Sequence, residues 1–228
     1  MSELWHALVK ALDLIVTLDP EVMQITGRSL GISVSTCVIA SVLAIPLGSL
    51  IHFSSFPGKR LAVSTIQTFY SLPTVLVGLL VFLVFSNAGP LGLFHLMFSP
   101  ALMIIGQAIL VLPLMMGLII SALSGVDKGV AETAGALGAS RIQTGTLLLR
   151  EARYAVMTAI ILGFGRAISE VGLALMVGGN IRGYTRVLTT AISLETNMGN
   201  IEFSLALGFI LLAIALIINL ALNRLQQR

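Results

Sequence analysis

Two charged residues stand inside a long apolar stretch of this 228-residue sequence. Arg166 and Glu170 lie four residues apart in the run 154–178, a spacing that places both side chains on one face of a helix. An isolated charge at the centre of a bilayer costs about 2.5–3.5 kcal/mol on insertion scales, so both should face the interior of a helix bundle. They are predicted either to form a structural ion pair or to line an anion pathway, in which Arg166 supplies positive potential and Glu170 limits trapping of the anion.

The other residue types that do chemistry in proteins are scattered. His6, His52 and His95 stand singly, without the spacing of metal ligands, so no metal site is expected. Cys37 lies in an apolar run, where a small packing role is expected. The sequence contains no Gly-x-x-x-x-Gly-Lys-Ser/Thr loop, so any nucleotide chemistry is expected to come from a partner.

The composition indicates that much of the chain is surrounded by lipid rather than water. Hydrophobic residues make up 57% of the sequence and charged residues only 10%, which is more apolar material than one soluble core can hide. Five apolar runs are each long enough to cross a bilayer, and none alternates with a period of two, so helices are predicted. We therefore expect an all-α membrane protein with one transmembrane domain over residues 1–228. The predicted crossings are 29–51, 61–86, 100–123, 154–178 and 203–222.

The distribution of Lys and Arg predicts how these helices are oriented. With the C-terminus in the cytoplasm, more basic residues lie inside than outside, and the loop 87–99 has none. The N-terminus is then outside. The basic residues predicted inside are Lys59, Arg60, Lys128, Arg141, Arg150, Arg153, Arg224 and Arg228, and those outside are Lys10, Arg28, Arg182 and Arg186.

The N-terminal segment differs from the five runs. Residues 4–18 are apolar but are interrupted by Lys10 and Asp13, which favours a helix lying at the membrane interface, where Trp5 would fit. The segment lacks the basic start and small-residue cleavage site of a signal peptide, so we expect it to be retained.

The cytoplasmic segment 124–153 has the composition of two short helices. Ser124 and Asp127 have capping-box spacing before a predicted Ala-rich helix at 130–137, which Gly138 would end, and a second helix is predicted from about Ser140. Two small helices joined at a glycine form a compact knob that suits a groove in a partner. The alternative is a hairpin that packs only on its own bundle.

The run Glu132-Thr133-Ala134-Gly135-Ala136-Leu137-Gly138-Ala139-Ser140 resembles the E-A-A-x-x-x-G signature of bacterial ABC importer permeases. In that family this loop forms a coupling helix that docks in a cleft of the ATPase. Thr133 replaces the first alanine of the signature. Arg150-Glu151 stand where the family usually has Leu-Pro, which leaves open whether a helix break precedes the fourth span. The resemblance assigns ATPase docking to Glu132, Thr133, Ala134, Gly135, Leu137, Gly138, Ala139, Ser140 and Arg141.

Other segments resemble the molybdate, sulfate and tungstate permeases within that family. They are the proline-containing stretches 69–78 and 111–115, the stretch 163–172, and Gly178-Gly179-Asn180-Ile181. Together the match covers roughly residues 25–225. The short sequences Ser-Glu-Val-Gly and Gly-Gly-Asn-Ile look most like those of the tungstate permeases. The resemblance implies a type I ABC importer permease fold with tungstate as cargo. Pro73 is added to Arg166 and Glu170 as a candidate for the translocation pathway.

The resemblance also implies partners. It predicts a homodimer in a bacterial or archaeal cytoplasmic membrane, two ABC ATPases that carry ATP and Mg²⁺, and an extracytoplasmic substrate-binding protein. This chain would bind no cofactor and no nucleic acid and would catalyse no reaction. The polar loop 179–200 is predicted either to meet the substrate-binding protein or to be a solvated loop. Its polar residues include Arg182, Tyr184, Arg186, Glu195 and Asn197.

Three other functions remain open from the sequence. The first is a permease for molybdate, sulfate or another small solute. The second is a secondary transporter driven by an ion gradient, in which Arg166 and Glu170 form a proton relay. The third is a structural membrane scaffold, which would need neither the docking-type loop nor the charged pair.

Overall fold

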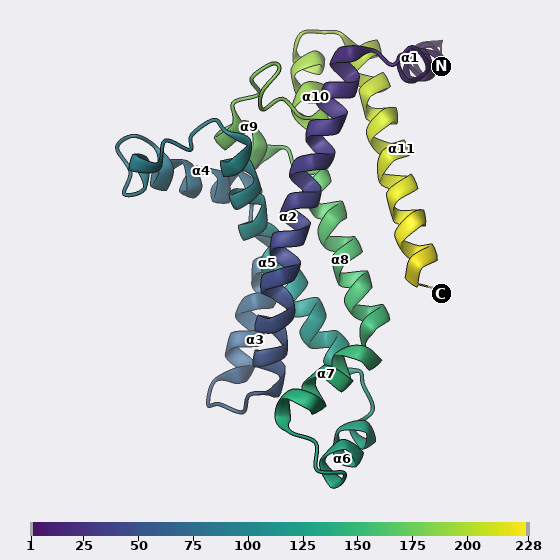
Figure 1. The fold of residues 1–228 in the computed structure, drawn as a ribbon. Coiled ribbons are helices and arrows are strands. Elements are labelled where there is room, and N and C mark those ends of the chain that lie inside the picture. Colours follow the sequence, from purple (N-terminus) through teal and green to yellow (C-terminus); the bar gives the residue numbers. More distant parts are fainter. Residues whose placement is uncertain (1, 227–228) are drawn as a thin grey trace.

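The computed structural model describes residues 2–226, which form helices and no strand. Arg228, part of the predicted charge pattern, lies outside the described residues. Three helices are long and apolar enough to cross a membrane: α2 (Pro20–Phe53), α5 (Pro100–Ser124) and α11 (Ile201–Gln226), the last over Ile201–Ala221. They run along the bundle in Figure 1. The predicted runs 29–51, 100–123 and 203–222 are therefore continuous helices.

Two predicted crossings are broken. Residues 61–86 form α3 (Lys59–Thr68), the 3-10 helix η1 (Phe69–Ser71) and α4 (Thr74–Phe85), with a bend of 98°. Residues 154–178 form α8 (Arg153–Ile168) and α9 (Gly172–Gly178), bent by 58°. Residues 2–226 thus contain three unbroken spans, or five if each bent pair crosses as one.

The helix α2 begins earlier than the apolar run predicted. The Asp19 carboxylate accepts hydrogen bonds from the N–H groups of Glu21 and Val22, both at 3.0 Å, and Pro20 occupies the first turn. Both features start helices. At 1.5 Å per residue, its 34 residues span about 51 Å, so α2 exceeds the hydrocarbon thickness of about 30 Å and its ends reach beyond it.

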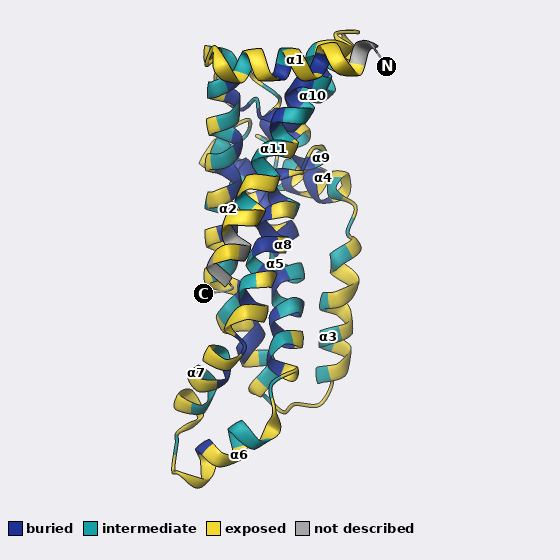
Figure 2. Cartoon of the chain, turned by 90° about the vertical axis from the view of Figure 1, so that its right-hand side faces the viewer, coloured by how far each residue is buried: buried dark blue, intermediate teal, exposed yellow. Residues whose placement is uncertain are grey.

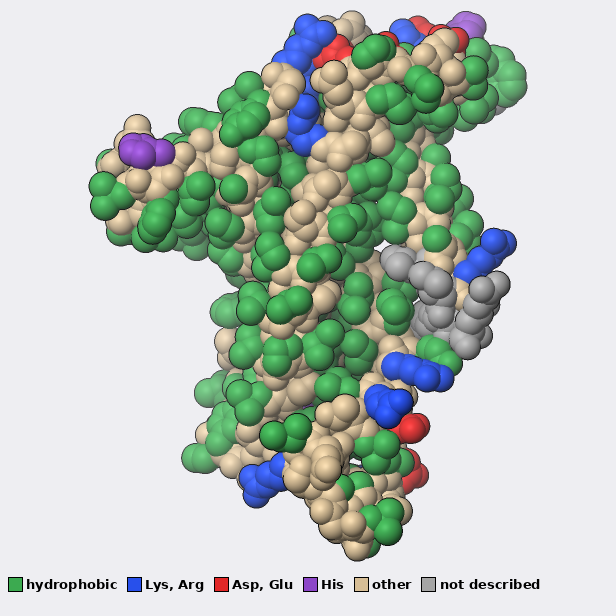
Figure 3. Space-filling view, viewed as in Figure 1, with side chains coloured by type: hydrophobic (Ala, Val, Ile, Leu, Met, Phe, Trp, Pro, Cys, Tyr) green, Lys and Arg blue, Asp and Glu red, His purple; other side chains and the backbone are tan. Residues whose placement is uncertain are grey.

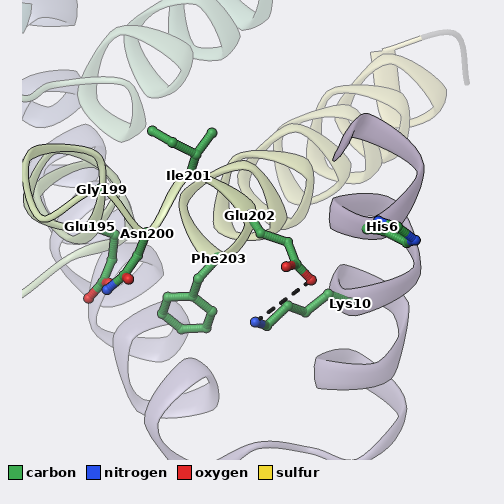
Figure 4. A pocket seen from close by; sticks show the side chains of 8 residues that line it. All are labelled: His6, Lys10, Glu195, Gly199, Asn200, Ile201, Glu202 and Phe203. Atoms are coloured by element: carbon green, nitrogen blue, oxygen red, sulfur yellow. Dashed lines mark hydrogen bonds and ion pairs between the residues drawn. The ribbon is translucent and has the colours of Figure 1, made fainter. Parts of the chain in front are cut away.

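The N-terminal helix α1 (Ser2–Val16) lies across the end of the bundle rather than along it (Figures 1 and 2). Ala11 is buried against α11 and α2, whereas Trp5 is 64% exposed. Lys10 is 3.9 Å from the carboxylate of Glu202 and lies over the Phe203 ring, 5.7 Å from its centroid (Figure 4). This placement agrees with the predicted interfacial helix.

The core extends along the bundle in successive clusters. At the end near α6 (Lys128–Ala136), α2, α5 and α8 pack around Met115, Ile119 and Leu148. Towards the other end α4, α5 and α9 pack around Leu102 and Leu173. A third cluster joins α1, α2, α10 (Leu188–Asn197) and α11.

The outward faces of the long helices are apolar. On α2, Val38 and Val42 are 56% and 66% exposed, and on α11, Leu212 and Ile217 are each 65% exposed. On the face shown in Figure 3, acidic side chains lie near the two ends and the band between them is rich in hydrophobic side chains. Such faces suit lipid or another membrane helix.

Candidate docking segment and translocation pathway

A helical hairpin extends beyond one end of the bundle (Figures 1 and 2). It consists of α6 and α7 (Arg141–Glu151). The predicted capping box of Ser124 with Asp127 is wrong: Ser124 is the last residue of α5, and its hydroxyl donates to the Ile120 carbonyl at 2.8 Å. Asp127 alone begins α6, where its carboxylate accepts the Gly129 N–H at 2.6 Å.

The turn between the two helices has a defined geometry. Gly138 adopts φ +81°, and its N–H donates to the Gly135 carbonyl while the Ala139 N–H donates to Ala134, each at 3.0 Å. This is a Schellman motif, which favours glycine at the left-handed position. Ser140 then forms a capping box with Gln143 at the start of α7. Both the glycine stop and the second helix from Ser140 are confirmed.

The hairpin exposes most of its predicted docking residues. Leu137 is 84% exposed, and Glu132, Thr133, Gly135, Gly138, Ser140 and Arg141 are also exposed. Ala139 is half-buried. Ala134 is only 6% exposed, so it packs within the hairpin and has little surface to offer a partner.

Ile142 was not among the docking residues predicted from the sequence. It is 82% exposed and lies close along the chain to Leu137. The sequence signal was an apolar residue in the first turn after the Ser140 cap. Leu137 and Ile142 thus give the tip an apolar surface of the kind that a partner groove can bury.

A helix break precedes the fourth span although Arg150-Glu151 replace the usual Leu-Pro. Ala152 separates α7 from α8 with ψ 3°, outside helical values. Leu148 and Ala152 are both buried in the cluster with Met115, whereas Arg150 and Glu151 are exposed. Burial of the two apolar residues, rather than a proline, accompanies this break.

The breaks in the two bent spans lie against each other. Leu72 and Pro73 are both extended, with ψ 128° and 121°. They separate η1 from α4, which begins directly after Pro73. A proline disfavours helical backbone in the residue before it, which explains the position of this break. A Cβ added to Gly172 would lie 2.8 Å from Thr74, at the start of α4. Pro73 and the α8–α9 break therefore belong to one region.

Close packing holds α4 on α9. A Cβ added to Gly78 would lie 3.1 Å from the Leu173 Cα and 3.1 Å from the Met176 Cβ. These distances are tighter than ordinary packing, so glycine at this position lets the two helices approach closely.

The predicted one-face arrangement of Arg166 and Glu170 is wrong. The helix α8 ends at Ile168, before Glu170, and no ion pair joins the two residues. Glu170 is 5% exposed and its carboxylate accepts the Leu173 N–H at 3.0 Å, in the first turn of α9. Its own carbonyl accepts the Thr189 hydroxyl at 2.7 Å. Glu170 thus fixes the break.

Arg166 is left without a counter-ion. It is half-buried in the last turn of α8, where a cation meets the negative end of the helix dipole. Within the described residues 2–226, no hydrogen bond or ion pair engages its guanidinium. Its neighbours Gly165 and Ser169 are exposed, and Thr158 lies further along the exposed face of α8. Leu162, between Thr158 and Arg166 on this face, is 49% exposed, so the face combines the small and polar residues with one large apolar side chain.

The helix α3 has a polar character of the same kind. Its exposed residues include Ser64, Thr65, Gln67 and Thr68, and Ser71 follows in η1. The hydroxyls of Thr65, Thr68 and Ser71 donate to nearby carbonyls of the same segment. In a chain that is 57% hydrophobic, such a helix suits a wet or protein-covered surface better than lipid.

At the opposite end of the molecule from α6, basic residues tie the loop after α9 to α2. Arg182 forms an ion pair with Glu21, and Arg186 reaches the same carboxylate at 3.5 Å. The Glu21 hydrogen bond raises the pKa of Arg182 above its usual range. Arg28 donates to the Arg186 carbonyl at 2.8 Å. Two arginines thus share the Glu21 carboxylate, and the third, Arg28, holds the backbone of Arg186.

The rest of the predicted loop 179–200 is partly helical. Tyr184 is 52% exposed and Asn197 is exposed at the end of α10. The half-buried Glu195 accepts a hydrogen bond from Asn200 at 2.9 Å. Both line a polar cavity of about 620 Å³ that also contains Lys10 and Glu202 (Figure 4). The loop is a structured surface with mixed charge.

Comparisons with known proteins match nearly the whole chain. The family model described as "Binding-protein-dependent transport system inner membrane component" matches residues 44–228. A "Probable anion ABC transporter permease protein" of Haloferax volcanii is 42% identical over 211 residues, which cover 90% of this chain and 91% of that protein.

Two further comparisons agree with the first. A "Tungstate uptake system permease protein TupB" of Peptoclostridium acidaminophilum is 39% identical over 217 residues, covering 95% of each chain. Among solved structures, a bacterial ABC transporter involved in the import of the acidic polysaccharide alginate matches with a TM-score of 0.77 at 18% identity, covering 95% of this chain and 83% of that one. This last likeness shows the fold.

Proposed function

The chain belongs to the family of binding-protein-dependent transport system inner membrane components, and on this basis we propose that it carries a small oxyanion, with tungstate as the first choice. The family and its ABC permease relatives make the chain a membrane-spanning transport subunit rather than an enzyme. The anion and tungstate descriptions of its relatives support the cargo. Sulfate permeases are more distant, at 24–27% identity.

One observation carries the anion pathway: the half-buried guanidinium of Arg166 has no counter-ion among residues 2–226. An unpaired cation is expensive in lipid, so this face of α8 is assigned to a water-filled pathway between two copies of the chain. Thr158 on α8, and Thr65, Thr68 and Ser71 on α3 and η1, complete its lining with their hydroxyls. A fixed positive charge attracts an anion without enclosing it, as passage requires.

The geometry also supports a route for coupling. The exposed tip with Leu137 and Ile142 docks in a cleft of a partner ATPase, which holds the ATP and Mg²⁺. Closure of the ATPase pair moves the hairpins, and α7 transmits the movement to α8 through the break at Ala152. Two copies of the chain, related by a two-fold axis, would each dock one ATPase.

The orientation follows from this docking. The end that carries α6 and α7 is cytoplasmic, which places α1 and the N-terminus outside and the C-terminus inside. The outer loop 179–200, with Arg182 and Tyr184 exposed, receives the substrate-binding protein. Its surplus positive charge is complementary to an incoming anion or an acidic receptor surface.

The test is ATP-dependent uptake of labelled tungstate into proteoliposomes that contain this chain, its ATPase and its soluble receptor. We expect uptake to require ATP and to collapse in a Glu132→Ala, Gly138→Asp variant that still inserts, because the docking turn is lost. Uptake that ignores ATP and follows a proton gradient would contradict the importer mechanism. Robust uptake of molybdate or sulfate without tungstate would correct only the cargo, and competition binding to the receptor would rank these anions.

A further inference from the structure

A large cleft opens where α2 ends, between α2, α3 and α5. We call it the α3 cleft and define it by His52, Phe56, Lys59, Arg60, Val63 and Ile120. Its volume is about 850 Å³. In Figure 2 the ribbon of α3 runs alongside the lower part of the bundle.

The cleft combines an apolar wall with a cationic rim. Phe56, Val63 and Ile120 supply the apolar surface, and Lys59 and Arg60 supply two positive charges. None of its lining residues is Asp or Glu, and neither cation forms an ion pair within residues 2–226. The Lys59 ammonium donates only to the His52 carbonyl. The cleft thus carries uncompensated positive charge.

The start of α3 adds to that charge. Gly58 precedes the helix and offers no side-chain cap, and the first turn contains no acidic residue. Lys59 and Arg60 therefore stand at the positive end of the helix dipole, where cations are unfavourable. The Lys59 and Ala62 N–H groups donate to the Phe56 and Gly58 carbonyls, so an anion at this point would neutralise both cations and meet the N–H groups between them.

The cleft lies at the same end of the bundle as the α6–α7 hairpin (Figure 1). The Ser124 hydroxyl, just before that hairpin, is 3.3 Å from His52 Nδ1. If this end is cytoplasmic, which rests on the proposed function, Lys59 and Arg60 lie at the level of the anionic headgroups of the inner leaflet. Basic pockets between membrane helices at this level suit such headgroups.

We propose that the α3 cleft binds one anionic phospholipid of the cytoplasmic leaflet. Its phosphate lies between Lys59 and Arg60, and the upper part of an acyl chain lies along Phe56, Val63 and Ile120. A bare oxyanion would fill only a small part of the cleft and would gain nothing from the apolar wall. The bound lipid neutralises the start of α3 and occupies the space that separates α3 from α5.

Native mass spectrometry of the complete transporter, this chain with its ATPase, tests the site. The complex is titrated in detergent with phosphatidylglycerol and, separately, with phosphatidylcholine. We expect one phosphatidylglycerol to be retained per chain in clear preference to phosphatidylcholine. In a Lys59→Gln, Arg60→Gln variant its affinity should fall roughly fivefold for each charge removed, whereas Arg224→Gln, a charge outside the cleft, should leave it unchanged.

Several outcomes would overturn the proposal. Equal retention of the two lipids, or unchanged retention in the double variant, would show that the cations do not select an anionic headgroup. Displacement of phosphatidylglycerol by millimolar tungstate would assign the cleft to the free oxyanion. Loss of chain–chain association in the double variant, with lipid retention unchanged, would assign it to a second copy. Lipid retention is measured without transport, so a negative result for the lipid site would not contradict the proposed transport of tungstate.

Discussion

At the scale of single residues, Arg166 and Glu170 have different roles because the helix ends between them. Because α8 ends between them, Glu170 accepts a hydrogen bond in the first turn of α9, whereas Arg166 has no counter-ion among residues 2–226 and lies on an exposed face of α8. A proton relay would require the two side chains to exchange a proton, and no contact joins them. The geometry therefore favours an electrostatic role for Arg166 and a structural one for Glu170.

Removal of the Arg166 charge should reduce transport without unfolding the chain. We expect Arg166→Gln to lower ATP-dependent tungstate uptake at least tenfold, because the pathway loses its fixed cation. Arg166→Lys keeps the positive charge, on an ammonium instead of a guanidinium, and should retain more uptake than Arg166→Gln. Initial uptake rates in proteoliposomes measure both, after normalisation to inserted protein. Full uptake by Arg166→Gln would place the anion elsewhere.

Glu170 should matter for stability more than for passage of the anion. Glu170→Ala leaves the buried Leu173 N–H without its acceptor, which costs about 1–3 kcal/mol. Glu170→Gln keeps an oxygen at that position, so a smaller loss of thermal stability is expected, with uptake near that of the unaltered protein. Thermal unfolding in detergent compares the two variants. A stable Glu170→Gln protein without uptake would instead make the carboxylate part of the pathway.

At the scale of elements, helix content was predictable and helix continuity was not. Apolar runs marked every crossing because burial in lipid demands them, and Pro73 was visible at one break. No proline marks the breaks after α7 and α8, which depend on the buried Ala152 and on the Glu170 carboxylate. Those tertiary contacts join residues to partners that sequence spacing does not identify, so the predicted placement of Glu170 on one helix face with Arg166 was wrong.

The contact between α4 and α9 should be sensitive to a single methyl group. Gly78→Ala places a Cβ 3.1 Å from Leu173 and Met176, so the helices must separate slightly, at a cost of about 1–3 kcal/mol. Gly27→Ala in α2 is the matched control, because nothing lies within 4 Å of its added Cβ. We expect a lower melting temperature for Gly78→Ala and an unchanged or higher one for Gly27→Ala. Equal melting temperatures would show that α4 adapts freely.

At the scale of the whole molecule, the two ends are chemically different. One end has the α6–α7 hairpin with its exposed apolar tip, and the other has α1 and the arginines that share Glu21. A transporter that docks an ATPase on one side and a receptor on the other needs such an asymmetry. The orientation of the chain in the membrane therefore tests the proposed function as a whole.

Single cysteines at the two ends can measure that orientation. The native Cys37 is 7% exposed and should not react, so the unaltered chain is the control. Leu93→Cys, in the predicted outer loop, and Leu137→Cys, at the hairpin tip, replace side chains that are 88% and 84% exposed. With a membrane-impermeant thiol reagent on intact cells, we expect labelling of Leu93→Cys at once and of Leu137→Cys only after permeabilisation. The reverse pattern would put the hairpin outside, where no ATPase can dock, and would overturn both the coupling route and the inner-leaflet lipid site.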